Sequence, residues 1–236
     1  MPATSLIAGL SLLAALAAPP PELPRGGEPV TLDPAQFTTR IDNPYWPMRP
    51  GTRWVTRETE PDGTRQKVVV RVTHRTKRIA NGVTARVVRD TVTERGRKVE
   101  DTRDWYAQDA AGNVWYLGER TKEYEHGRVV STEGSFEAGV DGAQAGVVVP
   151  AHPVPGMHYR QEHYAGHAED RARIVSRREQ AGVPYGHFRN VLMIREDNPL
   201  EPKVLEFKFY ARGIGPLLAV SVSGGSDREE LLRFRR

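Results

Sequence analysis

The chain has 236 residues, a formal net charge of +4 and no cysteine. Without cysteine we expect no disulfide bond, no thiolate metal site and no lipid anchor on an N-terminal cysteine. Acidic residues are interleaved with the basic ones along almost the whole chain. The small positive charge therefore favours a mildly basic protein over one that binds nucleic acid.

The N-terminus carries an unbroken apolar run, LIAGLSLLAALAA, from Leu6 to Ala18. A membrane-spanning helix needs about 20 such residues, whereas a run of this length is typical of a secretory signal peptide. Ala15, Leu16 and Ala17 give the small-x-small pattern of a cleavage site. We therefore predict a signal peptide over residues 1–17 and a secreted or periplasmic protein.

Two segments of different character follow. Residues 18–40 are rich in proline and glycine and lack periodicity, which indicates a flexible linker or arm. Residues 41–54, IDNPYWPMRPGTRW, place aromatic side chains between prolines, so we expect a fixed, turn-rich clasp that lies against the rest of the protein. We predict that residues 41–236 form a single β-rich domain.

From Val68 onward the hydrophobic pattern has a period of two, which indicates strands with one buried face. Asn81-Gly82 predicts a tight hairpin turn, and further turn signals separate the later strands. The expected strands cover residues 68–77, 83–94, 98–108, 114–125, 129–133, 157–164, 168–179, 187–197, 204–211, 217–223 and 228–235. Residues 134–155 show little pattern and predict a long loop of the kind that often carries function.

These strands follow one another in sequential hairpins. A sheet of this many antiparallel strands twists strongly and tends to curl or close, because closure hides its edges. We therefore predict an all-β fold: an antiparallel meander forming one large twisted sheet, closed as a half-barrel or barrel with alternate side chains lining its interior.

Several long motifs resemble a known family of exported, β-rich bacterial proteins of unknown function. They are IDNPYWP (Ile41–Pro47), PGTRW (Pro50–Trp54), DWYAQDAAGNVWYLGE (Asp104–Glu119), EGSFEAGVDGA (Glu133–Ala143) and YRQEHYAGHAED (Tyr159–Asp170). The resemblance implies a fold class and a location outside the cytoplasm. It implies no catalytic residue.

Acidic and aromatic residues gather on two neighbouring predicted strands and the loop after them. The candidate ligand-binding residues are Asp104, Trp105, Trp115, Glu119, Glu123 and Glu133. A strict period of two places Trp115 and Glu119 on one face and Tyr116 on the other. Turned into a curved sheet, these side chains would form a pocket for a polar or sugar-like ligand.

Two other interpretations of these acids remain open. They could form a solvated outer face, paired across strands with Arg86, Arg103 and Arg120. Alternatively, two of the carboxylates could act together in glycoside hydrolysis.

Other chemistry has weaker support. His152, His158, His163 and His167 could ligate zinc, but their strand-and-turn context gives no ligand spacing, so scattered surface histidines are the preferred interpretation. No serine lies in a G-x-S-x-G elbow. We expect neither a metal nor a cofactor.

Together these features predict a non-catalytic ligand-binding or carrier domain. Its partner would be a polar small molecule or a component of the cell envelope, with no nucleic acid and no membrane anchor. The alternatives are a secreted, hydrolase-like enzyme that uses the acidic residues, and a structural or interaction protein of the envelope.

Overall fold

The computed structural model describes residues 22–236, which form 17 β-strands and one short 3-10 helix. The predicted signal peptide lies outside the described residues. The elements are η1 (Pro34–Gln36), β1 (Phe37–Thr38), β2 (Arg53–Thr59), β3 (Arg65–Arg78), β4 (Thr84–Glu94), β5 (Arg97–Asp109), β6 (Val114–Arg120), β7 (Glu123–Glu125), β8 (Arg128–Ser131), β9 (Phe136–Glu137), β10 (Gln144–Val149), β11 (His158–Arg160), β12 (Glu162–His163), β13 (Arg171–Val183), β14 (Gly186–Asp197), β15 (Leu205–Ala211), β16 (Gly215–Ser223) and β17 (Arg228–Arg235).

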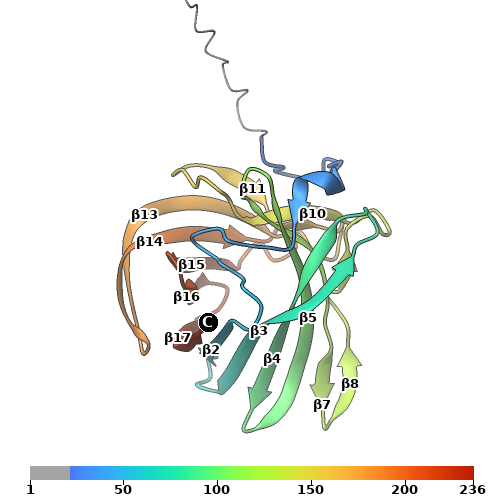
Figure 1. The fold of residues 1–236 in the computed structure, drawn as a ribbon. Helices are drawn as coiled ribbons and strands as arrows, with labels where there is room; N and C mark the ends of the chain where they lie inside the picture. The colour runs from blue at the N-terminus through green and yellow to red at the C-terminus, as the bar shows by residue number, and fades with distance from the viewer. Residues whose placement is uncertain (1–21) are drawn as a thin grey trace, which may run out of the picture.

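The strands pair around a nearly closed barrel (Figure 1). Strands β2 to β6 form one antiparallel meander, and β13 to β17 form a second. On one side β17 pairs with β2. On the other, β10 pairs with both β6 and β12, while the adjoining β11 pairs with β13. The predicted all-β antiparallel fold is confirmed.

Most predicted strands are present within a few residues of their expected bounds, and β17 matches its prediction. The Asn81-Gly82 hairpin also forms, because Gly82 supplies the positive φ of 92° that the turn needs. Strand β2 was not predicted. It begins at the end of the proposed clasp, where prolines conceal the start of the alternation.

The prediction of an unstructured loop over residues 134–155 is wrong. This segment contains β9 and also β10, the strand that joins the two meanders. Residues 145–149 are all buried. A strand covered on both faces shows no polar alternation, so the run AGVVV gave no recognisable period.

The predicted pairing of faces along β6 is also wrong. Gly118 has φ 125°, and the register between β5 and β6 shifts beside it. This bulge reverses the alternation, because one extra residue moves the following side chains to the other face. Tyr116 and Glu119 therefore both face the barrel interior, while Trp115 faces outward.

The predicted clasp does lie against the barrel. Ile41, Tyr45 and Met48 are buried. Trp46 stacks in tilted geometry against two interior tyrosines, Tyr106 at 5.4 Å and Tyr210 at 5.8 Å between ring centroids. The clasp thereby closes one end of the barrel.

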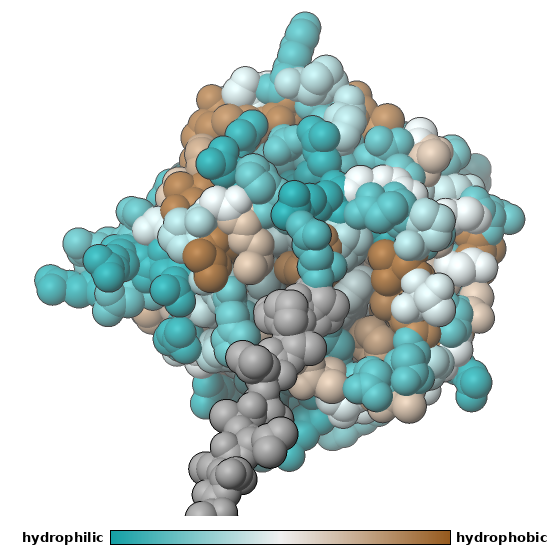
Figure 2. All heavy atoms as spheres, turned by 90° about the horizontal axis from the view of Figure 1, so that it is seen from above, coloured by the Kyte–Doolittle hydropathy of each residue, from teal (hydrophilic) through white to brown (hydrophobic). Residues whose placement is uncertain are grey.

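The described part of the preceding arm is also fixed in place. Its strand β1 pairs with β5. The buried guanidinium of Arg160 donates hydrogen bonds to the carbonyl oxygens of Ala145 at 3.0 Å, Glu28 at 2.6 Å, and Gly26. Seen from this side, the surface mixes small hydrophobic areas with hydrophilic ones (Figure 2).

Within residues 22–236, no helix has the length and apolar character needed to cross a membrane.

Candidate functional site

Charged dipeptides recur along the strands that surround the interior. Arg57-Glu58 on β2, Arg89-Asp90 on β4, Arg103-Asp104 on β5 and Glu119-Arg120 on β6 each combine a basic and an acidic residue. Neighbours on a strand point to opposite faces. In all four the carboxylate faces the interior and the arginine faces outward, so the pleat separates charges that the sequence interleaves.

Three pairs of interior acids lie directly opposite one another across neighbouring strands. The pairs are Glu58 with Glu229, Asp104 with Glu119, and Glu196 with Glu206. Like charges in such positions destabilise a sheet unless protons or cations separate them. The interior is therefore an acidic site that needs protons or a cation.

A cavity of about 210 Å³ lies between the clasp and this acidic region. Its aromatic wall consists of Trp46, Trp54, Tyr106 and Tyr210. Its polar wall consists of Asp90, Asp104, Lys208 and Glu229. An apolar wall facing a few charged groups is the usual composition of a small-molecule site.

Asp90 is the least satisfied of these acids. Its Oδ1 atom is buried and has no hydrogen-bond donor among the described residues. Burial, together with the nearby carboxylates of Glu229 and Glu100, raises the pKa of Asp90 to about 8. A buried carboxylate oxygen without a donor is costly, so Asp90 would gain from a donor placed in the cavity.

Asp104 and Glu119 share one hydroxyl group. The Tyr116 Oη atom lies 3.0 Å from Asp104 Oδ1 and 2.6 Å from Glu119 Oε2. A hydroxyl carries a single proton, so one of the two carboxyls must itself be protonated. Burial raises the pKa of Asp104 well above its ordinary value, and the neighbouring Glu119 adds to the shift.

The shared hydroxyl also bears on catalysis. Tyr116 occupies the space between Asp104 and Glu119 where a glycosidic bond would have to sit for these two acids to flank it. The geometry therefore gives no support to their use as a glycosidase pair.

Lys208 forms ion pairs with two acidic side chains. Its Nζ atom lies 2.6 Å from Glu196 Oε2 and 3.3 Å from Glu206 Oε2. Burial favours the neutral amine, but Glu196 and Glu206 outweigh it and hold the pKa of Lys208 well above its ordinary value. Asp90, Asp104 and Glu229 have no comparable cation within ion-pairing distance among the described residues.

The structure separates the six candidates proposed from sequence. It brings Asp104 and Glu119 together inside the barrel. Trp105 and Trp115 lie on the outer face, the first under the Lys77 ammonium and the second against Phe37 of the arm. The remaining two candidates, Glu123 and Glu133, are exposed on the outside.

Sequence reasoning missed Asp90, Lys208 and Glu229. The repeated arginine–acid dipeptides were the available signal, since neighbours on a strand point to opposite faces and each dipeptide therefore places its acid and its arginine on different faces. A strand was predicted over residues 204–211, but nothing in the sequence showed that its face with Glu206, Lys208 and Tyr210 lines the interior.

The histidines between residues 152 and 167 do not form a cluster. His152, His158 and His167 are exposed, and His167 stacks on Tyr164. Within residues 22–236, no group of three or more histidine, aspartate or glutamate side chains is placed to hold a metal ion.

No protein-family model matches the chain, and a search of curated proteins gives no match. Among solved structures, the chain is similar to one described as a "putative lipoprotein" from Parabacteroides distasonis ATCC 8503. The two share 10% sequence identity and a TM-score of 0.43, over 81% of this chain and 98% of the other. The resemblance of the sequence motifs to an exported bacterial family stays a prediction.

Proposed function

We propose that this protein is an exported, non-catalytic binding domain whose barrel interior takes up a small organic cation. The observation that carries the proposal is Asp90, whose buried Oδ1 faces no donor beside a cavity walled by aromatic rings. An alkylammonium group supplies N–H donors and positive charge for the acids, and the same cation can lie over the indole and phenol faces in cation–π contacts.

The acids continue from the cavity along the inner face of β2. Thr56 lines the cavity, Glu58 follows two residues later and Glu60 two residues after that, beyond the end of the strand. Burial and the opposing Glu229 raise the pKa of Glu58 to about 7. Carboxylates along such a route attract cations and raise their local concentration.

The size of the cavity limits the ligand. At roughly 30 Å³ per water molecule, its volume of about 210 Å³ corresponds to seven waters. A linear diamine, which keeps its N–H donors, is of this size. A lipid or an oligosaccharide is too large for this space.

Titration calorimetry with 1,4-diaminobutane tests the proposal, with 1,4-butanediol as the uncharged control of the same chain length. We expect the diamine to bind and the diol not to bind. Binding should strengthen between pH 5.5 and pH 8.5 because the diamine stays protonated while the interior acids ionise.

Three single variants test whether the diamine binds in the barrel interior. Asp90→Asn and Asp104→Asn should each weaken diamine binding, whereas Glu123→Gln, which removes an exposed carboxylate on β7, should leave it unchanged. Equal binding of diamine and diol, or equal loss in all three variants, would overturn the proposal.

A further inference from the structure

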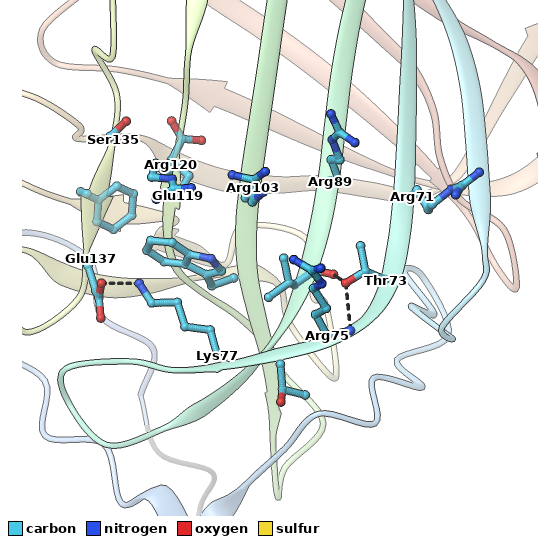
Figure 3. A pocket seen from close by; sticks show the side chains of 14 residues that line it. Arg71, Thr73, Arg75, Lys77, Arg89, Arg103, Glu119, Arg120, Ser135 and Glu137 are labelled. Atoms are coloured by element: carbon cyan, nitrogen blue, oxygen red, sulfur yellow. Dashed lines mark hydrogen bonds and ion pairs between the residues drawn. The ribbon is translucent and has the colours of Figure 1, made fainter.

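A row of arginines crosses the outer face of the barrel. Arg53, Arg71, Arg89, Arg103 and Arg120 lie on β2 to β6, and each is directly opposite the next across its strand pair. Neighbouring strands are about 4.8 Å apart, so the row repeats one guanidinium at about that interval. Figure 3 shows the last four of these side chains side by side on their strands.

Most of this charge is not neutralised within the protein. Only Arg89 meets an acid, through two hydrogen bonds to Asp101 at 2.9 and 2.6 Å. Among the described residues, no carboxylate lies within 4.0 Å of the Arg71, Arg103 or Arg120 guanidinium groups. The Nε atom of Arg53 is buried without a hydrogen-bond partner. Like charges directly opposite one another destabilise a sheet, so the row is costly without an anion.

Four of the five arginines line a groove of about 1020 Å³. Lys77, on the far end of β3, forms an ion pair with Glu137 on β9 at 2.5 Å, and Figure 3 shows this pair along one side of the row. The groove follows the arginines across the strands, and two acidic residues, Glu119 and the paired Glu137, also line it.

We propose that this groove binds an extended acidic polysaccharide, which lies across strands β3 to β6 with its acidic groups on successive arginines. A guanidinium binds a carboxylate or sulfate through two parallel hydrogen bonds. A chain with a charged group on every sugar presents acids at regular intervals, as the row presents arginines.

The groove fits nucleic acid and membrane surfaces less well. Single-stranded nucleic acid binds through aromatic faces on which bases stack, but Trp105 is buried and the Lys77 ammonium lies 3.5 Å from its ring centroid. Membrane-surface binding adds exposed apolar side chains to basic ones. The apolar residues of this groove, Val87, Trp105 and Phe136, are all buried. Recognition here therefore depends on charge and hydrogen bonding.

The test measures binding of polygalacturonate, which has one carboxylate per sugar, with neutral dextran as the uncharged polymer. The site variant is Arg71→Gln/Arg103→Gln/Arg120→Gln. The matched control, Arg177→Gln/Arg178→Gln/Arg189→Gln, removes the same charge from exposed positions on β13 and β14.

We expect the wild type and the control to bind polygalacturonate and not dextran. The site variant should bind roughly 3- to 150-fold more weakly, since each of the three exposed ionic contacts contributes about 0.2–1 kcal/mol. Urea denaturation should show that the site variant is at least as stable as the wild type, because it loses three opposed charges.

Three results would overturn the proposal: no binding by the wild type at low salt, equal weakening in both triple variants, or tighter binding of poly-dT or of phosphatidylglycerol vesicles than of polygalacturonate. Asp90→Asn leaves the outer face intact and should bind the polymer normally. The outcome is therefore independent of the cation site in the barrel interior.

Discussion

Replacing Asp90 with asparagine tests how the acidic interior is held together. The wild-type side chain must take up a proton on folding at neutral pH, because its pKa is raised from about 3.9 in the unfolded chain to about 8 in the folded one. Asparagine keeps the shape, has no charge to lose and places an N–H donor beside the neighbouring carboxylates.

The magnitude follows from the difference between the pH and the unfolded pKa. At 1.36 kcal/mol per pH unit, proton uptake by Asp90 costs at most about 4 kcal/mol at pH 7 and about 1.5 kcal/mol at pH 5. The stability that protonated Asp90 contributes is fully present below pH 4 and is lost as the pH rises toward 8. We therefore expect Asp90→Asn to stabilise the protein at pH 7 and to stabilise it much less at pH 5.

Urea denaturation of both proteins between pH 5 and pH 8 gives the free energies of unfolding directly. Glu58, whose pKa is also raised by burial and by Glu229, is present in both proteins, so most of its contribution cancels in their difference. The exposed Glu123→Gln variant is the control and should show a constant difference from wild type. A difference between Asp90→Asn and wild type that does not change with pH would refute the reasoning.

Three further variants test the surrounding structure. Tyr116→Phe removes the hydroxyl between two buried carboxyls, so the free energy of unfolding should fall by about 1–3 kcal/mol; an unchanged midpoint in urea would contradict this network. Gly118→Ala places a Cβ against the Phe136 carbonyl oxygen at a φ of 125°, and the strain should cost at least about 2 kcal/mol. An unaltered melting temperature would show that the bulge does not require glycine. Arg160→Met keeps the side-chain volume but removes the hydrogen bonds that hold residues 26–28, so limited proteolysis should cut the arm sooner than in wild type; equal cleavage rates would contradict that role.

The order of the strands could be predicted from the sequence because it depends on local chemistry. Alternation of side chains marks each strand, and turns such as Asn81-Gly82 fix where one ends and the next begins. Hairpins between consecutive strands then require an antiparallel meander. Strand β10 was not predicted because burial on both faces removes the alternation that marks a strand in the sequence.

The candidate site could be predicted only in part. Asp104 and Glu119 were proposed because acidic and aromatic residues gather on the strands that carry them. The structure places both inside the barrel. The bulge at Gly118 separated Glu119 from Trp115, since a one-residue shift exchanges the faces of a strand. No pattern in the sequence reveals such a shift, because it depends on the register with a neighbouring strand.

The sequence by itself determined the fold class and the alternation of arginine with acid in dipeptides such as Arg89-Asp90 and Arg103-Asp104. It did not determine which of these charges lies inside, because alternation assigns residues to two faces without showing which way the sheet curves. The direction in which the sheet curves, which brings β17 beside β2, determines which face lies inside the barrel. This curvature gathered the acids in the interior and left these arginines in one row outside, although the interleaving of charges along the sequence had not pointed to a basic patch at these positions.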